Sequence, residues 1–400
     1  MIHLSRRVQQ MSPSPTLSMT KRALELKAEG MDIIALSLGE PDFNTPEHAE
    51  EAGIAAIRAH FTKYTAVDGM AQMKAAIQRK FQRDNGLEFA ADEITVSSGS
   101  KIVLYNAIMA TVDPGDEVII PAPYWVSYPD MVKLADGVPV FVTGAQNNGF
   151  RMRPEDLQQA ITPRTRMLIL NSPNNPSGAA YSAHDLKALA AVLLRHPRVV
   201  VLTDEIYEHL VYDDFQTASI AAVEPRLADR TITSNGMAKG YGMTGWRIGF
   251  AGGPRTLIRA IADLQSQNVN APNTISQYAS VAALDGPQDY LRERAALYKQ
   301  RRDLAVDRLN AIPGLACHRP EGAFYLYPHC AGIIGKRTAH GQLIETDEDF
   351  VLALLDTQGV AAVHGGAFGL SPYFRISYAL STDELEEGLS RIARFCATLT

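Results

Sequence analysis

Five polar segments of this 400-residue chain each follow a short apolar run, and they hold the residue types of a small-molecule site. "SPNNPSG" follows "RMLILN", "DEIYEH" follows "VVVLT", "MAKGYGMTGWR" follows "TITSNG", "SGSK" follows "EITVS", and "PYWVSYP" follows "EVIIPA". They supply an acid, a lysine, an arginine, amides, aromatic rings and a Gly/Ser turn. Because ligands collect outside the carboxyl ends of strands in open α/β sheets, these segments could surround a small aromatic ring that bears an anion.

The segment around Lys239 offers two kinds of chemistry. Gly240, Gly242 and Gly245 satisfy G-x-G-x-x-G, a pattern that lets a pyrophosphate approach a helix N-terminus. The "GWRIGFAGG" that follows is typical of a strand entered from a turn, so the glycines favour a turn over a nucleotide site. Lys239 and Arg247 stand eight residues apart. A partly desolvated lysine can form a Schiff base, and an arginine can clamp a phosphate.

Two further segments could hold charge. Gly99, Ser100 and Lys101 precede the helical pattern "IVLYNAIMA" and could present N–H groups and a helix dipole to a phosphate; an ordinary helix cap is the alternative. Asp204 ends the most apolar run, where a buried carboxylate would be costly without a cation. A protonated ring nitrogen would be such a partner, and an N-cap of "EIYEHL" is the alternative.

The elements that must position these residues alternate in an α/β pattern. Strands are expected in seven apolar runs, at 93–99, 117–122, 138–143, 166–172, 199–205, 231–236 and 247–253. Several are apolar along their whole length, as in parallel strands buried on both faces. Helices are expected at 16–29, 69–83 and 287–312, and a closing helix begins near Asp383. We expect a large domain at 46–289 and a smaller one from 1–45 and 290–400, the latter with strands in "AFYLYP", "GVAAVHG" and "FRISYA".

Composition argues against several classes of function. The 38 basic and 44 acidic residues are intermixed and give a net charge of −6, so a nucleic-acid surface is not expected. Apolar runs such as "ALAAVLL" are too short to span a membrane. Arg6 and Arg7 are not followed by an apolar block, so we expect a cytoplasmic protein without a secretory signal. Cys317, Cys330 and Cys396 are scattered, which indicates neither a disulfide nor a metal site.

The motifs resemble those of the fold type I pyridoxal-phosphate enzymes, specifically the class I aminotransferases. "NSPNNPSG", "TDEIYEH" and "NGMAKGYGMTGWRIG" stand in the family's order and spacing, with "LSLGEPDF" before them and "FRISYA" after them. The resemblance covers nearly the whole chain. It implies a large domain with a mostly parallel seven-stranded sheet and a smaller α+β domain.

The resemblance implies roles around pyridoxal 5'-phosphate. Lys239 would hold the cofactor as a Schiff base and then move a proton, and Asp204 would pair with the ring nitrogen. Asn175 and Tyr207 would hydrogen-bond the ring hydroxylate. The phosphate would be held by Arg247 with the backbone of Gly99, Ser100 and Lys101, while Trp125 would stack on the ring.

The resemblance also implies how the substrate binds. Arg375 would take the α-carboxylate of an amino acid or 2-oxo acid, with help from Asn175 and the backbone of Gly39. Tyr64 would reach the phosphate of a neighbouring subunit, which implies a homodimer with shared sites. One position departs from the family, because Gly236 stands where many relatives place a serine that touches the phosphate. That hydroxyl is then absent or comes from Ser98 or Ser234.

Substrate choice depends on a second cation. Relatives that take dicarboxylic substrates through an arginine carry it in the segment matching "QSQNVNAPNTISQ", where this chain has none. Lys101 instead matches a lysine of the bacterial aspartate-type subgroup. With Thr16 it also matches members that accept prephenate as well as aspartate. Aspartate with 2-oxoglutarate is therefore the expected pair.

Other functions stay open from the sequence. Prephenate, aromatic, alanine or kynurenine transamination is the nearest alternative, and a C–S lyase that works by elimination follows. A non-catalytic ligand-binding regulator is a third, although only about 15 residues precede the first expected fold helix, which is too few for a helix-turn-helix.

Overall fold

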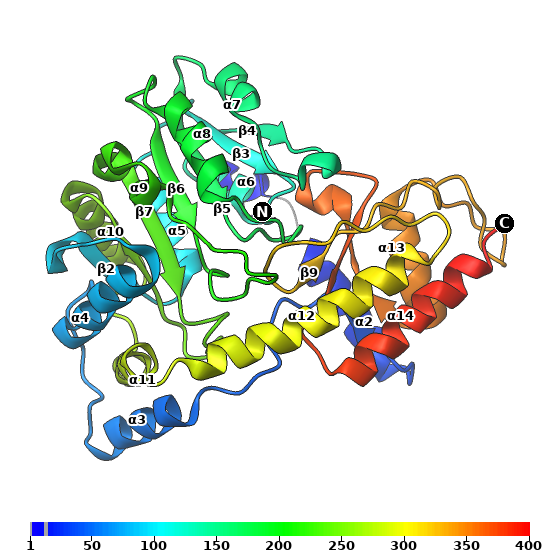
Figure 1. Ribbon diagram of the computed structural model, residues 1–400, viewed down its shortest axis with the longest axis horizontal. Coiled ribbons are helices and arrows are strands. Elements are labelled where there is room, and N and C mark those ends of the chain that lie inside the picture. The colour runs from blue at the N-terminus through cyan, green and yellow to red at the C-terminus, as the bar shows by residue number, and fades with distance from the viewer. Residues whose placement is uncertain (1, 12–14) are drawn as a thin grey trace.

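The computed structural model describes residues 2–11 and 15–400, with side chains from residue 18 onward in the second range. Its central feature is a seven-stranded sheet (Figure 1). In spatial order the strands are β2 (Ile94–Ser97), β8 (Gly249–Gly252), β7 (Thr231–Gly236), β6 (Val200–Asp204), β5 (Thr165–Asn171), β3 (Glu117–Ala122) and β4 (Val138–Thr143). Strand β8 runs antiparallel to both neighbours, and the other pairs are parallel. Each of the seven predicted runs overlaps one of these strands.

Both faces of the sheet are covered by helices, which explains the uninterrupted apolar runs. Neighbouring residues of one strand enter different cores: Met167 and Ile169 face α5 (Ser100–Met109), α6 (Tyr128–Leu134) and α10 (Arg255–Asn268). Leu168 and Leu170 face α7 (Pro154–Ala160), α8 (Ala183–Leu193) and α9 (Ile220–Val223). A strand buried on both sides needs apolar residues at every position.

A third apolar cluster packs beside β2 and β8. It joins α3 (Glu47–Arg58), α4 (Ala71–Lys80) and α11 (Thr274–Asp285). Met70, Met73, Ile77 and Phe81, which lie at helical spacing within the predicted helix at 69–83, are buried in it. The predicted helix at 69–83 ends differently, because α4 gives way at Phe81 to a π-helical turn, η1 (Phe81–Asn85).

A separate core contains the C-terminal part and the segment after α1 (Arg6–Gln9). Its elements are α2 (Pro15–Ala28), β1 (Ile34–Ala35), α12 (Asp289–Asn310), β9 (Tyr325–Leu326), α13 (Asp347–Gln358), β10 (Val360–Ala361), β11 (Val363–His364), β12 (Phe374–Ser377) and α14 (Thr382–Ala397). The run predicted as one strand at 359–365 is divided, since β10 pairs with β1 and β11 pairs with β12. Short 3-10 turns complete the fold: η2 (Ala91–Glu93), η3 (Gln146–Asn148), η4 (Pro225–Arg230) and η5 (Gly365–Phe368).

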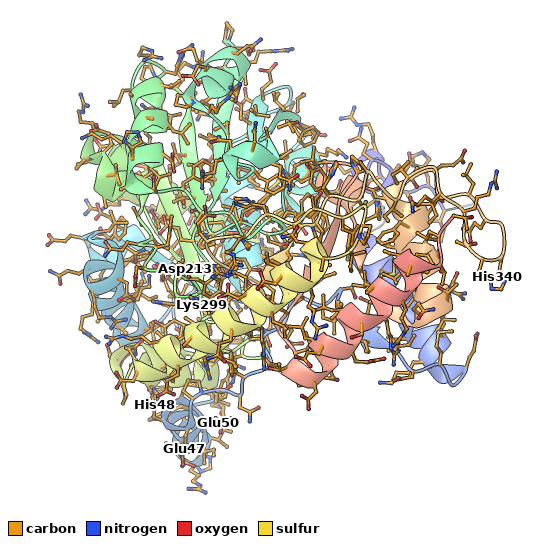
Figure 2. The ribbon with its side chains drawn as sticks, turned by 45° about the vertical axis from the view of Figure 1, so that its right-hand side comes forward. Glu47, His48, Glu50, Asp213, Lys299 and His340 are labelled. Atoms are coloured by element: carbon orange, nitrogen blue, oxygen red, sulfur yellow. The ribbon has the colours of Figure 1, made fainter. Side chains whose placement is uncertain are left out.

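Helix α12 joins the two halves of the molecule (Figure 1). Leu291 near its start packs in the cluster of α3, α4 and α11, whereas Tyr298 and Leu309 pack in the C-terminal core. Lys299 lies 3.1 Å from Asp213 of the loop after β6 (Figure 2). One helix therefore contributes to both cores, and the predicted domain boundary at residue 289 stays a prediction. Within the described ranges, no helix combines the length and the apolar character needed to cross a membrane.

Candidate active site

The carboxyl ends of the parallel strands bring the predicted polar segments together. Asn171 at the end of β5 is the pairing partner of Asp204 at the end of β6, and Asp204 pairs in turn with Ser234 of β7. Lys239 follows β7 by three residues. Adjacent parallel strands therefore place the acid and the lysine at the same edge, as their sequence positions predict.

Lys239 points toward the segment that precedes α3. Its Nζ donates a hydrogen bond to the carbonyl oxygen of Gly39 over 2.6 Å and lies 5.7 Å from the ring centre of Phe324. The pKa of Lys239 is lowered to about 8, chiefly by burial; Glu40 and Asp204 act to raise it, and Arg375 and Arg247 act to lower it. A substantial fraction of this amine is therefore uncharged near pH 8, as a nucleophile or proton acceptor requires.

Asp204 is a buried carboxylate, 4% exposed, and the part of the chain that the structure describes holds no ion pair to it. Tyr128 of α6 donates its hydroxyl to Oδ2 over 2.7 Å, and the amide N–H of Ile206 reaches Oδ1 at 3.4 Å. Burial raises the pKa of Asp204 to about 6, against the opposing effects of these hydrogen bonds and of Lys239. A cationic ligand beside Asp204 would offset the cost of its burial.

Arg375 of β12 enters from the C-terminal core and is only 3% exposed. Its Nη1 donates to Oδ1 of Asn175 over 2.9 Å, and its Nη2 donates to the carbonyl oxygen of Ser37 over 2.7 Å. Nε has no hydrogen-bond partner, and the guanidinium lies 4.7 Å from the ring centre of Tyr325. Burial lowers the pKa of this group. A buried guanidinium bonded only to neutral groups is a fitting receptor for a carboxylate.

Tyr207 is a buried side chain. Its hydroxyl is 2.9 Å from the hydroxyl of Tyr325, and burial raises the pKa of Tyr207 well above its ordinary value. Both side chains are therefore neutral phenols at physiological pH. The role expected for Asn175 and Tyr207 toward a shared ring is not visible in their present contacts, since Asn175 binds Arg375 and Tyr207 contacts Tyr325.

The segment before α5 and Arg247 form an anion cradle. Gly99 has a φ of 103°, and a Cβ there would lie 2.4 Å from Nη2 of Arg247. The guanidinium therefore packs directly on the glycine backbone. Nη1 of Arg247 donates to the carbonyl oxygen of Thr244 over 3.0 Å, and the described residues include no carboxylate paired with it. The first turn of α5 adds N–H groups that have no partner inside the helix.

Gly236 has a steric explanation. A Cβ at this position would lie 2.4 Å from Oγ of Ser100 and 3.0 Å from the carbonyl oxygen of Ile248. The Ser100 hydroxyl thus occupies the space of a side chain at 236, and it donates to the carbonyl oxygen of Asn235 over 2.9 Å. Ser234, one suggested substitute, is buried within the sheet.

Lys101 extends over an aromatic face. Its Nζ lies 4.7 Å from the ring centre of Trp125, which in turn packs edge-on against Tyr128. Partial desolvation, and then the positive charge of Arg247, lower the pKa of Lys101. Lys101, Arg247, Lys239 and Arg375 give this edge of the sheet an excess of cations, which favours anionic ligands.

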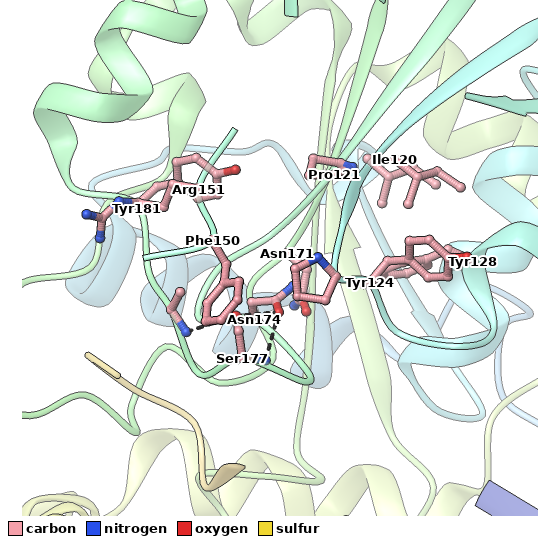
Figure 3. A pocket seen from close by; sticks show the side chains of 13 residues that line it. Ile120, Pro121, Tyr124, Tyr128, Phe150, Arg151, Asn171, Asn174, Ser177 and Tyr181 are labelled. Carbon is pink, nitrogen blue, oxygen red and sulfur yellow. Dashed lines mark hydrogen bonds between the residues drawn. The ribbon is translucent and has the colours of Figure 1, made fainter. Parts of the chain in front are cut away.

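A small hollow lies behind this edge and is a separate feature. Figure 3 shows Tyr128 and Asn171 at its wall, with Asn174 hydrogen-bonded to Ser177. Its volume is 20 Å³. That is room for about one water molecule, which needs at least roughly 10–15 Å³, and too little for a cofactor or substrate.

Comparison with known proteins gives the family. The model of aminotransferase class I and II matches residues 31–392. The chain belongs to this aminotransferase family. Aspartate aminotransferase of Rhizobium meliloti is 55% identical over 98% of this chain and 96% of its own length. Aspartate/prephenate aminotransferase of Cereibacter sphaeroides is 53% identical over 100% of both chains.

Solved aminotransferase structures have the same fold. The crystal structure of the Rhizobium meliloti aspartate aminotransferase is 54% identical and superposes with a TM-score of 0.98 over 100% of both chains. Aspartate aminotransferase from Thermus thermophilus with maleate gives a TM-score of 0.92 at 42% identity, over 99% of this chain and 100% of that one. Two predictions, the fold type I architecture and membership of the pyridoxal-phosphate-dependent aminotransferases, are therefore confirmed.

The donor set of this aminotransferase chain fits pyridoxal phosphate, the cofactor of its family. The cradle at Gly99 and Arg247 suits a dianionic phosphate, the buried Asp204 suits a protonated ring nitrogen, and the amine of Lys239 suits an aldehyde. Each group matches a different part of one small molecule.

Two predicted residues stand apart from this cluster in the aminotransferase chain. Tyr64 lies in the loop after α3 and is 89% exposed. Thr16 lies in the first turn of α2, and its side chain is outside the described residues.

Three residues that contact the cluster were not singled out from the sequence. Asn171 donates to the carbonyl oxygen of Asp204 over 2.9 Å, and its position directly after an apolar run was an available signal. Tyr128 lies in the segment "PYWVSYP" that follows another apolar run, which was a similar signal, whereas Tyr325 reaches the site only through the packing of a distant element.

Proposed function

We propose that this aminotransferase transfers the amino group of aspartate to 2-oxoglutarate, using pyridoxal phosphate attached to Lys239. The observation that carries the proposal is the convergence of Lys239, Asp204 and Arg375 on one edge of the sheet. Relatives named aspartate or aspartate/prephenate aminotransferases support the substrate. The Thermus thermophilus relative was solved with maleate, which is a dicarboxylate.

Each residue of the site would have a role that follows from its charge and its position. When bound, pyridoxal phosphate supplies an aldehyde that takes up amino groups and a ring that withdraws electrons. Asp204 would keep a proton on the ring nitrogen, and Arg247 with the start of α5 would hold the phosphate. Nζ of Lys239, freed when substrate binds, would carry a proton away from the substrate Cα. Burial of the site would exclude water during that transfer.

Arg375 would orient the substrate by two-point binding of its α-carboxylate. We expect Arg375→Ala to lower kcat/KM for every amino acid roughly 10²- to 10³-fold, as when one partner of a buried charged pair is lost. Arg375→Lys is the matched control: it retains the charge but not the fork, and should recover only part of the rate. Steady-state kinetics with aspartate and alanine would test this, and a loss limited to aspartate would contradict it.

Lys101 would bind the second carboxylate of a dicarboxylic substrate. We expect Lys101→Ala to lower kcat/KM for aspartate about tenfold more than for alanine, the size of one charge-assisted hydrogen bond. Lys101→Arg should retain the preference for aspartate. Equal losses for both substrates in Lys101→Ala would remove this specificity argument.

A homodimer would complete the site through Tyr64. This side chain is almost fully exposed, and the apolar Ile54, Ile57 and Phe61 are exposed on α3 and the loop after it. Such a patch supports burial against a second copy of the chain. Light scattering that gives the mass of a single chain at micromolar concentration would contradict the dimer.

The function as a whole is tested by half-reactions. The purified protein is loaded with pyridoxal phosphate, and its visible spectrum is followed as single amino acids are added without an acceptor. Aspartate and glutamate should convert the spectrum faster than phenylalanine, alanine or kynurenine. Faster conversion by phenylalanine would favour an aromatic aminotransferase. Release of pyruvate without an acceptor would favour a C–S lyase, and no spectral response would favour a non-catalytic regulator.

A further inference from the structure

A largely buried polar cluster adjoins the residues of the proposed cofactor site in the chain. It comprises Lys80, Asn85, Glu205, Glu208, Ser219 and Asn235, drawn from α4, η1, the segment after β6, the loop before α9, and β7. None of these residues has a part in the proposed reaction. Burying two carboxylates and an ammonium is costly, so their mutual contacts need an explanation.

The π-helical turn η1 delivers Asn85 to the cluster. Its Nδ2 lies 3.0 Å from Oε2 of Glu205, 2.7 Å from Oε2 of Glu208 and 3.2 Å from Oγ of Ser219, and its Oδ1 accepts from Lys80 Nζ over 2.5 Å. A π turn changes the direction in which the last side chains of a helix point, and such turns are frequent at functional sites.

Glu208 is the acceptor at the centre of the cluster. One oxygen, Oε1, accepts from Lys80 Nζ and from Nδ2 of Asn235, the latter over 2.7 Å, while Oε2 accepts from Asn85. Burial raises the pKa of Glu208, but the charge of Lys80 and the other donors outweigh this and lower it overall. Glu208 is therefore a carboxylate that needs all three donors.

Asn235 connects the cluster to the groups that would hold the cofactor. It stands four residues before Lys239, its Oδ1 accepts from the amide of Gly236 over 2.8 Å, and its carbonyl oxygen accepts from Ser100 of the anion cradle. The amide of Glu205 donates to the carbonyl oxygen of Ser234 over 2.9 Å. The segments that carry Asp204, Lys239 and the anion cradle are thus joined through one set of hydrogen bonds.

We infer that Lys80, Asn85, Glu208 and Asn235 are positioning residues that hold Lys239 and the anion cradle in register with Asp204. This inference rests on the proposed function, since it concerns the placing of the same cofactor-binding groups. The cluster acts through backbone and side-chain contacts and does not touch substrate.

A metal ion is a less favourable use of the same residues. Asp84, Glu208 and His209 bring ligand atoms within 4.8 Å of one another. Lys80 already pairs with Glu208 and lies 3.9 Å from Asp84, so a second cation would be repelled.

Two neighbouring glutamates give a matched test. In E208Q the side chain keeps one acceptor oxygen and gains an NH₂ group. That NH₂ must face either Asn85 or the pair Lys80 and Asn235, and because all three are donors, a hydrogen bond is lost on that side. Glu205 differs: Oε2 accepts from Asn85 and Ser219, and Oε1 contacts only the hydroxyl of Thr203 at 3.1 Å. A hydroxyl can accept as well as donate. In E205Q the amide oxygen can therefore accept from Asn85 and Ser219 while the NH₂ donates to Thr203, so every contact is kept.

The experiment compares E208Q with E205Q in protein freed of cofactor and titrated with pyridoxal phosphate. We expect E208Q to weaken cofactor affinity roughly 10- to 100-fold and to shift the pH midpoint of the visible band, as when a supporting group of a binding site is lost. E205Q should change affinity less than about threefold, because its hydrogen bonds remain. Asn85→Ala, at a half-buried position, should resemble E208Q and serves if E208Q does not fold.

A variant far from the cluster separates an effect on cofactor binding from a general loss of stability. Leu389→Ala removes a buried side chain of α14 far from the cluster and is compared at matched loss of Tm. Unchanged affinity and band in Leu389→Ala, with both altered in E208Q, would support positioning. Equal changes in the two variants, or equal effects of E208Q and E205Q, would overturn it. A wild-type protein that gains no visible band would instead overturn the proposed function.

Discussion

We expect Lys239→Ala to abolish the visible band of pyridoxal-phosphate-treated protein and to lower the transamination rate roughly 10²- to 10⁴-fold or more, the range for a lost acid–base group. The reason is that no other described amine lies where Nζ of Lys239 does, beside the carbonyl of Gly39 and among Arg375, Arg247 and Asp204. Absorbance after gel filtration and single-turnover kinetics with aspartate measure the two effects.

Lys101→Ala is the control for Lys239→Ala, since it removes another lysine of the same edge but should retain the band. A band of wild-type intensity in Lys239→Ala would show that the cofactor is attached elsewhere. It would remove the basis of the proposed function.

We expect Asp204→Asn to lower kcat roughly 10²- to 10³-fold, comparable to the loss of one preorganised electrostatic group. The amide has nearly the same shape and its oxygen can still accept from Tyr128, so apart from the long contact with Ile206 N–H at 3.4 Å the loss reports the charge. The matched control is Glu205→Gln, the corresponding acid-to-amide change one residue later, which should cost far less. Equal kcat values for Asp204→Asn and wild type would contradict the assigned pairing with a ring nitrogen.

Stability of Asp204→Asn should change in the opposite direction from activity. Burial raises the pKa of Asp204 from 3.8 to about 6, so the folded chain binds this proton more tightly than the unfolded chain does. The contribution of this group to wild-type stability therefore falls as the pH rises from 3.8 to about 6. Asparagine does not titrate.

Without cofactor, Asp204→Asn should be more stable than wild type by about 3 kcal/mol above pH 6, and the gap should close below pH 4. Urea unfolding at several pH values measures this. A gap that does not depend on pH would contradict the cost attributed to the buried charge. A group that lowers stability while serving the reaction is expected at an active site.

Six of the seven strands of the large sheet were predictable because they are buried on both faces; the edge strand β4 is largely exposed. Leu168 and Leu170 pack on one side of β5 while Met167 and Ile169 pack on the other, so the sequence shows a run without polar interruption. The division of 359–365 into β10 and β11 was not predictable, because partners far along the chain decide it. The end of α4 in a π turn depends on contacts of Asn85 with residues more than a hundred positions away.

The site was predictable where a residue's position in the chain determines its position in space. Asp204 ends a strand and Lys239 follows the adjacent one, so a parallel sheet brings them to one edge. Arg375 was expected from family resemblance, but its contacts with Ser37 and Asn175 come from three separate segments.

By itself, the amino-acid sequence determined the α/β class, the strands and the identities of the lysine, acid and arginines, since apolar runs and strand-end polar residues are local signals. Only the tertiary structure decided that the Ser100 hydroxyl fills the space beside Gly236, that Tyr128 binds Asp204, and that Lys80 pairs with the buried carboxylate of Glu208. These contacts depend on how distant elements pack, and the free energy of a buried contact depends on both partners, so neither residue's local sequence reveals it.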